Sequence, residues 1–215
     1  MNLFSSEEVA LLRVAGQVRK YPRGQIIFSA LDAAAYVYYI EAGWVRIFRL
    51  GSEGQKVTVG SLREPGQMLG LAEALRGEVR TCFAEALTEV SLLKIAVPAF
   101  RRLLLQYPAL ACKVASLLAE RMRAAEEMVH ELASLPVSGR LALFLLRAAE
   151  RYGVPKNGAI LIDLRLTHED MASIIGTSRQ TVTQTINAFK REKSVAVAGR
   201  KILVLDRARL ARWAQ

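Results

Sequence analysis

The chain has 215 residues, of which 52% are hydrophobic and 23% charged, so it is long enough for one large domain or two small ones. This composition excludes a disordered tail and a small disulfide-stabilised protein. Two cysteines, Cys82 and Cys112, are too few for a four-cysteine zinc or iron–sulfur site within one chain, and they suit a reducing compartment. No stretch approaches about 18 uncharged residues, and the N-terminus lacks a signal-type apolar core. We therefore expect a cytoplasmic protein with no membrane partner.

The excess positive charge lies in the C-terminal part of the chain. Overall, 30 Lys and Arg stand against 20 Asp and Glu, a formal net charge of +10. Residues 1–135 hold 16 basic and 14 acidic side chains, net +2, whereas residues 136–215 hold 14 and 6, net +8. A small, strongly basic region indicates a nucleic-acid partner, although basic surfaces also occur simply for solubility.

The first hundred residues predict a β domain. Eight of the 14 glycines lie between Gly24 and Gly77. They separate or flank short runs of β-forming residues at 25–28, 36–40, 44–50, 56–62, 81–86 and 90–95. Many short strands with glycine turns are typical of a small all-β sandwich or barrel.

A long helix is predicted from residue 108 to residue 135, and a second from Val137 to Tyr152. Apolar residues of the long helix alternate at spacings of four and three, which is a heptad seam: Ala111, Ala115, Leu118, Met122, Ala125, Val129 and Leu132. Arg121 and Glu126 then fall at positions where a parallel partner helix allows an interchain ion pair. The seam predicts a parallel homodimer. The alternative is that this stripe packs on the chain's own β domain.

The most informative segment predicts two short helices joined by a tight turn. Thr167 and Asp170 form a capping box, and Gly176 permits the turn. Ser178 caps the second helix. Its inner stripe consists of Val182, Ile186 and Phe189. Small, turn and core residues at positions 172, 176 and 182 are typical of a helix-turn-helix motif.

The outward face of the second helix carries side chains that read DNA. Arg179 suits guanine or phosphate, glutamine suits adenine, and the methyl group of Thr183 suits thymine. No acidic residue occurs between Asp170 and Glu192, whereas an ordinary solvated face would carry Glu/Lys pairs. A hairpin with two cations at its tip follows, and we interpret it as a wing that contacts phosphates. The predicted DNA-binding residues are Thr167, Ser178, Arg179, Gln180, Thr183, Gln184, Lys190, Arg200 and Lys201.

Together these features resemble the CRP/FNR family of bacterial transcription regulators over nearly the whole chain. The resemblance implies an α+β fold: an N-terminal double-stranded β-helix of the cyclic-nucleotide-binding, jelly-roll type, a long dimerisation helix and a C-terminal winged helix-turn-helix. It places the sensor roll at residues 1–107, the dimerisation helix at 108–135 and the DNA-binding domain at 136–215. It also implies a homodimer on an inverted repeat of double-stranded DNA, contact with RNA polymerase, and no enzymatic activity.

Residues 66–81 resemble the phosphate-binding cassette of that roll. In members that bind cyclic AMP, an arginine pairs with the phosphate, a Ser or Thr bonds it, and a glutamate after the glycine holds the ribose. Arg80 and Thr81 match the first two, but Leu71 replaces the glutamate. Leu71 would leave a ribose hydroxyl unpaired, and Glu126 would place a negative charge near the phosphate. Because each would cost on the order of 1–3 kcal/mol, cyclic AMP is disfavoured. The candidate effector-binding residues are Gly70, Leu71, Arg80, Thr81, Arg121, Ala125 and Glu126.

The effector itself is unknown. Arg80 either anchors another small anion or forms an ion pair within the roll. The cysteine count excludes an iron–sulfur cluster, and haem is disfavoured because residues 1–129 contain no histidine. The same absence argues against a cupin-type metalloenzyme, and no metal site is expected. A constitutive regulator, or one that responds through the thiol of Cys82, is the alternative.

The expected half-site differs from the family's commonest one. Gln180 stands where the family usually has Glu, and Gln184 stands where it often has Arg. Two glutamines in place of readers of cytosine and guanine predict adenine at these contacts.

Overall fold

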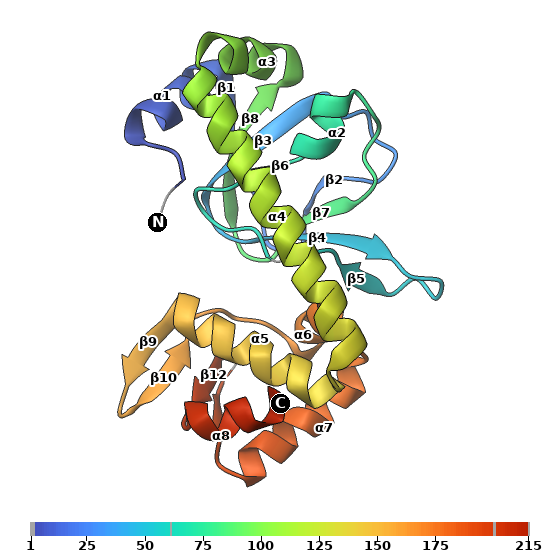
Figure 1. Cartoon of the computed structure of the whole chain (residues 1–215), viewed down its shortest axis with the longest axis vertical. Coiled ribbons are helices and arrows are strands. Elements are labelled where there is room, and N and C mark those ends of the chain that lie inside the picture. The colour runs from blue at the N-terminus through green and yellow to red at the C-terminus, as the bar shows by residue number, and fades with distance from the viewer. Residues whose placement is uncertain (1–2, 61, 200, 215) are drawn as a thin grey trace. The chain divides into compact units, whose positions relative to one another are not determined.

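A computed structural model describes residues 3–60, 62–199 and 201–214 and divides the chain into two compact units, residues 1–125 and 126–215 (Figure 1). The division falls inside the long helix α4 (Pro108–Ser134), so this helix contributes to both units. The predicted long helix is confirmed. The predicted domain limits after residues 107 and 135 stay a prediction.

The first unit is built on two four-stranded antiparallel sheets, with strand orders β1-β8-β3-β6 and β2-β7-β4-β5. All six predicted runs overlap strands, and the predicted β-roll is confirmed. Its strands are β1 (Gly16–Tyr21), β2 (Ile26–Phe28), β3 (Tyr36–Ala42), β4 (Val45–Leu50), β5 (Lys56–Thr58), β6 (Met68–Leu69), β7 (Phe83–Ala86) and β8 (Val90–Ala96). Strand β1 lies outside the predicted runs because it is polar and mostly exposed, and β6 because it has two residues.

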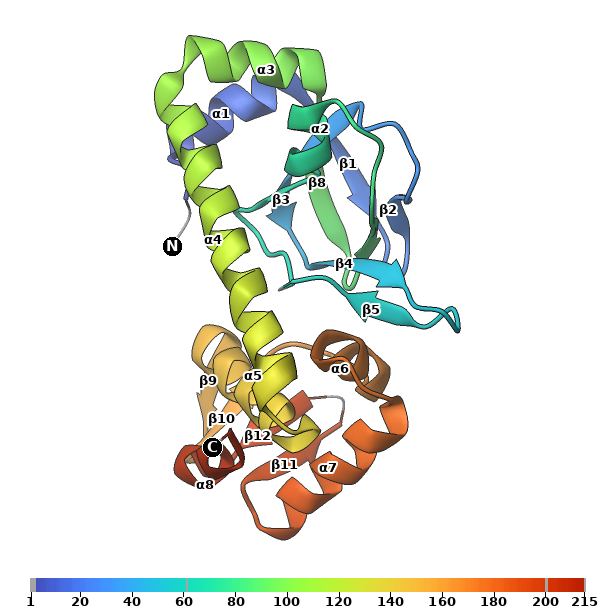
Figure 2. The same cartoon turned by 45° about the vertical axis from the view of Figure 1, so that its right-hand side comes forward.

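Three short helices flank the roll: α1 (Ser6–Ala15), α2 (Leu71–Arg76) and α3 (Val97–Gln106). Helix α1 begins at a capping box between Ser5 and Glu8. Both views place α1 and α3 beside the start of α4 (Figures 1 and 2). Apolar residues from the three short helices, from the start of α4 and from the first sheet form one buried cluster with Phe4. Its members are Phe4, Leu12, Val37, Tyr39, Met68, Leu71, Ala74, Leu93, Ile95, Phe100, Leu110, Val114 and Leu117.

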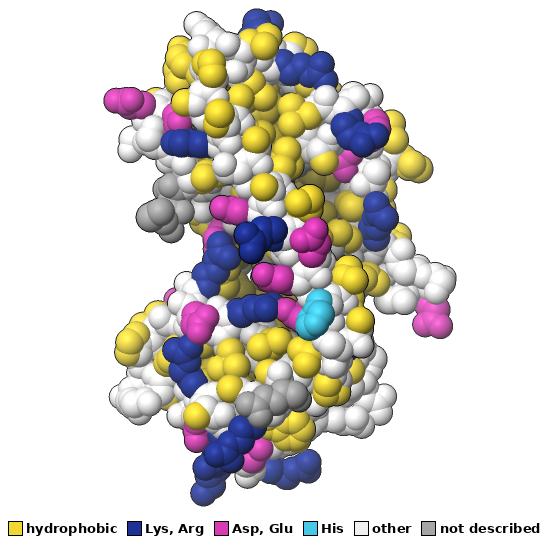
Figure 3. Space-filling model, in the orientation of Figure 1, with side chains coloured by type: hydrophobic (Ala, Val, Ile, Leu, Met, Phe, Trp, Pro, Cys, Tyr) yellow, Lys and Arg dark blue, Asp and Glu magenta, His cyan; other side chains and the backbone are white. Residues whose placement is uncertain are grey.

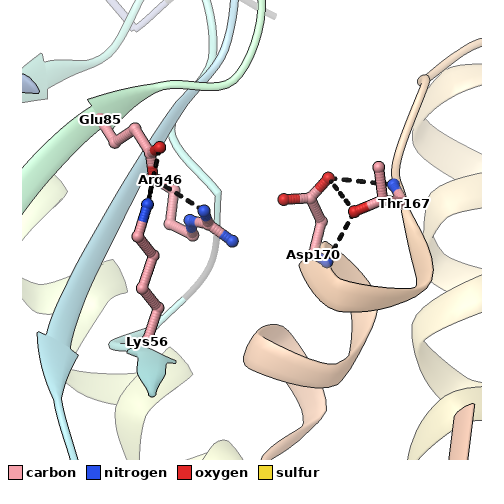
Figure 4. A network of polar contacts seen from close by, with 5 residues as sticks. All are labelled: Arg46, Lys56, Glu85, Thr167 and Asp170. Atoms are coloured by element: carbon pink, nitrogen blue, oxygen red, sulfur yellow. Dashed lines mark hydrogen bonds and ion pairs between the residues drawn. The ribbon is translucent and has the colours of Figure 1, made fainter. Parts of the chain in front are cut away.

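A buried ion-pair cluster joins three strands of the second sheet. The Glu85 carboxylate on β7 accepts bonds from Arg46 on β4 at 2.7 Å and from Lys56 on β5 at 2.8 Å (Figure 4). Arg46 and Glu85 are 4% and 7% exposed. Since a buried charge is tolerated only when it is paired, this cluster fixes the register of the three strands against one another.

Helix α4 carries two apolar stripes. The first, Leu110, Val114 and Leu117, is buried in the cluster of the roll. The predicted heptad seam is a second stripe, of which Leu118 also packs against this cluster. Its later large residues Met122, Val129 and Leu132 are 61%, 66% and 48% exposed. Hydrophobic side chains also lie on the surface around the first part of α4 (Figure 3). No single described helix is long and apolar enough to span a membrane; α3 and α4 meet that criterion only as a pair bent by 114°.

The second unit is a winged helix-turn-helix (Figure 2). Its sheet is antiparallel, in the order β11-β12-β10-β9. Its elements after α4 are α5 (Val137–Tyr152), β9 (Gly153–Lys156), β10 (Ala159–Ile162), α6 (His168–Ile175), α7 (Arg179–Arg191), β11 (Val195–Ala198), β12 (Lys201–Val204), α8 (Arg207–Ala211) and the 3-10 turn η1 (Arg212–Ala214). The predicted second helix is confirmed with its bounds. Leu141, Leu145 and Leu210 are at most 1% exposed and form part of its core.

Candidate DNA-binding surface and effector pocket

Side chains cap the helix ends of the helix-turn-helix. The Asp170 N–H donates to Thr167 Oγ1 at 3.0 Å, and the Thr167 N–H donates to the Asp170 carboxylate at 2.9 Å (Figure 4). Gly176, with a φ of +68°, ends α6 in the left-handed region. Ser178 Oγ accepts the Thr181 N–H at 3.1 Å and begins α7. The predicted capping box, turn and second cap are confirmed, so local sequence sets where both helices begin.

Helix α7 has one buried face and one exposed face. The inner stripe is 0–1% exposed: Val182, Ile186 and Phe189. On the other side, Arg179, Gln180 and Gln184 are exposed. In the described part of the chain, no other side chain bonds to these three side chains. Their polar groups therefore remain available for a partner outside the domain.

Thr183 differs from these three neighbours. Its Oγ1 donates to the Arg179 carbonyl at 2.9 Å and lies 2.8 Å from Nδ1 of His168. The hydroxyl is thus occupied inside the domain, and the methyl group remains for a base contact. His168 joins the start of α6 to α7, so it has a structural role at this position.

The predicted hairpin forms, and strands β11 and β12 pair Ala198 with Lys201. The Lys201 ammonium is bound to the Asp163 carboxylate, and this hydrogen bond holds the pKa of Asp163 below its usual range. Lys190 is exposed near the end of α7. Arg200 lies outside the described residues. One of the two expected wing cations therefore already has an internal partner.

Arg80 is the most buried charged side chain of the roll, 2% exposed. Its Nη1 donates to the Gly70 carbonyl at 2.8 Å, and its Nη2 donates to the Tyr36 carbonyl. The guanidinium carbon lies 4.4 Å from the ring centre of Phe28. Gly70 has a φ of +69°, and a Cβ there would lie 2.4 Å from Nη1 of Arg80. Only glycine allows this close approach.

Arg80 also pairs with Glu73, which sequence reasoning missed. The Nη1 to Oε2 distance is 3.4 Å. Thr81 Oγ1 donates to Glu73 Oε1 at 3.0 Å. Burial alone would raise the pKa of Glu73, but hydrogen bonds from its own backbone and from Thr81, together with the charge of Arg80, lower it. Of the two roles expected for Arg80, the ion pair within the roll is observed.

Leu71, expected among the effector residues, is a core residue. It is 1% exposed and belongs to the buried cluster with Met68 and Phe100. Helix α2 begins directly after the left-handed turn at Gly70, and Leu71 enters the core there. No polar side chain replaces the ribose-binding glutamate at this position.

Arg121 faces its own roll. Its Nη2 donates to the Met68 carbonyl. In this orientation Arg121 does not form the interchain ion pair with Glu126 that the heptad pattern predicts. Burial, and after it the positive charge of Arg63, lowers the pKa of Arg121 to about 9. Burial likewise lowers the pKa of Arg63 to about 10. Ala125 and Glu126 are exposed on α4.

The comparisons with known proteins agree with this architecture. Residues 18–107 match the family of cyclic nucleotide-binding domains, and residues 139–213 match the family of Crp-like helix-turn-helix domains. The chain is 32% identical over 192 residues to the global nitrogen regulator of Synechococcus elongatus, covering 88% of this chain and 86% of that protein. The chain belongs to the CRP/FNR family of transcription regulators.

Other CRP/FNR proteins are similar over most of their length. A CRP-like cAMP-activated global transcriptional regulator of Mycobacterium tuberculosis is 29% identical over 207 residues, covering 96% of this chain and 92% of that protein. The solved structure of a CRP/FNR regulator from Thermus thermophilus is 28% identical, with a TM-score of 0.77, and covers 92% of this chain and 98% of its own. The chain is thus a regulator and not an enzyme.

The structure places the Cys82 thiol beside Arg49. Cys82 is 8% exposed, and its sulfur accepts a bond at 3.4 Å from Nε of Arg49 rather than from Arg80. Within the described ranges, no group of three or more His, Cys, Asp or Glu side chains is placed to hold a metal ion. His130, a possible axial ligand by residue type, is exposed and close to Ser134.

Proposed function

We propose that the chain acts as a homodimer that reads an inverted repeat through α7 and is controlled by a small effector, other than cyclic AMP, at the roll. One observation carries the DNA-reading part. Arg179, Gln180 and Gln184 are exposed on a helix whose opposite stripe is 0–1% exposed. A helix held rigidly by its inner face can place its outer polar groups against base edges in the major groove.

The exposed seam of α4 supports the dimer. Met122, Val129 and Leu132 recur at heptad spacing, and each is about half or more exposed in the single chain. A partner helix that covered this seam would remove apolar surface from water. The stripe that packs on the roll is Leu110, Val114 and Leu117, joined by Leu118 of the seam, so the later seam residues such as Met122 and Val129 are available to a second copy.

The site preference is tested by selecting DNA from a random library with the full-length protein. We expect an inverted repeat with adenine at the contacts of Gln180 or Gln184, since glutamine bonds adenine bidentately. Gln180→Ala and Gln184→Ala each relax selection at one position of the half-site. Gln106→Ala, an exposed glutamine at the end of α3, is the matched control. Unchanged dependence on G·C at both positions contradicts the assignment.

The effector assignment rests on the cationic side of the roll. Burial lowers the pKa of Arg63, and burial together with the charge of Arg63 lowers the pKa of Arg121, so a small anion beside Arg121 would relieve part of that cost. Leu71 and Ala125 offer no polar group to a ribose or an adenine, and the negative charge of Glu126 disfavours a nearby phosphate. We expect calorimetry to detect no cyclic AMP binding at physiological concentration. Micromolar affinity contradicts this part of the proposal.

The internal ion pair of Arg80 with Glu73 favours a second candidate, a constitutive regulator with a ligand-free roll. Native mass spectrometry of the protein as purified distinguishes the two. A dimer heavier than two chains supports an effector and provides it for identification. A dimer of bare chain mass, with DNA affinity that no fraction of cell metabolites alters, supports the constitutive regulator. A monomer contradicts the heptad assignment.

Contact with RNA polymerase belongs to the same proposal, through the family. In an in vitro transcription assay, the protein should raise or lower initiation at a promoter that carries the selected site. A promoter with the half-sites scrambled is the control. No effect at any spacing between site and promoter contradicts the polymerase contact but leaves DNA reading intact.

A further inference from the structure

The cassette of the roll already contains an anion. One carboxylate, that of Glu73, takes donors from both residues that the family resemblance assigns to a phosphate. Arg80 Nη1 lies 3.4 Å from Oε2, while the Thr81 hydroxyl and N–H lie 3.0 Å and 3.5 Å from Oε1. The two oxygens of a carboxylate thus occupy the donors that two oxygens of a phosphate would need.

Three of the five N–H donors of Arg80 are already used within the roll. Besides Glu73, they serve the backbone carbonyls of Gly70 and Tyr36. Among the nitrogens of this guanidinium, Nε alone is buried without a partner in the described residues. Nε–H and the second hydrogen of Nη2 have no acceptor among the described residues, so the charge of Glu73, rather than a shortage of donors, opposes a second anion. An anion that entered beside Glu73 would also place two negative charges on one buried cation.

The backbone holds Glu73 in this position. Helix α2 starts immediately after Gly70, and Glu73 is its third residue. The left-handed conformation of Gly70 lets Arg80 approach to where a Cβ would be only 2.4 Å away. The turn that brings the arginine against the cassette therefore also sets the start of the helix that carries the carboxylate.

We propose that Glu73 is a built-in anion that closes the cassette at Arg80 and Thr81 against external phosphate-type anions. Glu73 is then a specificity-determining residue: it excludes the ligand that the cassette of cyclic-nucleotide rolls accepts. This inference rests on the proposed effector role of the roll and refines it, since an anionic effector must either displace Glu73 or bind elsewhere, near Arg121.

The test is chemical rescue of full-length variants by inorganic phosphate. Glu73→Ala leaves a buried arginine without its carboxylate, and we expect its melting temperature to fall by on the order of 10 °C. Added phosphate, at ionic strength held constant with potassium chloride, should restore several degrees of that loss, because binding to the folded state alone stabilises it. The wild type should not respond. Glu78→Gln, which breaks the exposed pair with Arg76, is the control and should neither melt early nor respond.

Glu73→Gln gives a second measurement if Glu73→Ala fails to fold. It keeps the shape of the side chain and an acceptor for Thr81 but removes the charge. Calorimetric titration should show phosphate binding at least about tenfold tighter to Glu73→Gln than to the wild type. Equal phosphate binding by both, or a wild type that phosphate stabilises as much as the variants, overturns the proposal.

DNA binding is measured separately on the same proteins. Selection of DNA by the wild type tests the proposed function, and phosphate binding by the Glu73 variants tests the closed cassette. Loss of DNA reading with intact phosphate rescue contradicts only the former. Intact DNA reading without rescue contradicts only the latter.

Discussion

The helix-turn-helix and the cassette of the roll use the same kinds of side chain in opposite ways. On α7, Arg179, Gln180 and Gln184 are exposed, and the described residues offer their side chains no internal partner. In the cassette, Arg80 is 2% exposed, and its guanidinium bonds to two carbonyls and to Glu73. An arginine in the first region is available to an outside molecule, whereas the arginine in the second holds the domain together.

A DNA-reading side chain and a structural side chain differ in whether the domain already binds them. Polar side chains at helix ends, such as Thr167 and Ser178, satisfy local N–H groups and leave their neighbours free. A residue buried between strands has no such freedom, because a charge removed from water must be paired. Residue type alone therefore does not identify a ligand site. What identifies it is whether the side chain already has a hydrogen-bond or ion-pair partner within its own domain.

The largest expected effect comes from Arg80→Met. This variant removes the cation but leaves the Glu73 carboxylate and two carbonyls behind, which costs about 3–5 kcal/mol of the free energy of unfolding of the roll. Urea unfolding followed by Trp44 fluorescence, in a Trp213→Phe background, measures it. Arg179→Met, made in the same background, should change that free energy by less than about 0.5 kcal/mol. Equal losses in the two variants would remove the contrast between the regions.

The second prediction concerns Arg179→Ala. We expect specific DNA affinity to fall by about 1–3 kcal/mol, or roughly 5- to 150-fold, because a bidentate contact to guanine or phosphate is lost. Thermal unfolding should not change, since the Arg179 side chain is exposed and bonds to no other side chain among the described residues. Arg102→Ala, an exposed arginine on α3, serves as the control for overall charge. An affinity equal to that of the control places Arg179 outside the DNA contact.

The helix-turn-helix could be predicted from the sequence because its determinants are local. The bond from the Asp170 N–H to Thr167 and the bond from the Thr181 N–H to Ser178 each span three residues. Gly176 provides the turn between them, and the helical spacing of the inner stripe does not depend on the rest of the fold. Propensity and spacing therefore sufficed for the position, direction and outward face of α7.

The cassette could not be predicted in the same way. Arg80 meets Tyr36 across 44 positions of the chain, and Arg121 meets Met68 across 53. Such contacts follow from how strands and helices pack, which periodicity does not report. The heptad pattern placed Arg121 toward a partner helix, but tertiary packing directs it onto the roll. The spacing of Glu73 after Gly70 was visible, but nothing local marked it as the partner of Arg80.

A smaller effect is expected at the cap of the reading helix. Ser178→Ala removes the acceptor of the Thr181 N–H and should cost about 1 kcal/mol, whereas Ser178→Gly should cost only a few tenths. Hydrogen exchange of the first amides of α7 measures the loss within this unit. Ser116→Ala, which removes an exposed hydroxyl bonded to a carbonyl inside α4, is the control. Equal exchange in Ser178→Ala and the wild type contradicts a role for the cap in holding the reading face.

The weakest effect is expected at Lys201, where we ask whether a cation released from its internal ion pair contacts a DNA phosphate instead. Lys201 on the wing is bound to Asp163, whose pKa that bond lowers, so the carboxylate keeps its charge at neutral pH and loses it only at acid pH. Asp163→Asn releases the ammonium at neutral pH. If the wing lies against phosphates, the slope of log affinity against log salt should steepen by up to about 0.9, the value for one phosphate contact, and Lys201→Gln should not steepen it.

Glu169→Gln, which removes one exposed carboxylate at the start of α6, controls for net charge. A slope that changes equally in Asp163→Asn and Glu169→Gln means that Lys201 stays a structural cation like Arg80, since its release then adds no contact with DNA.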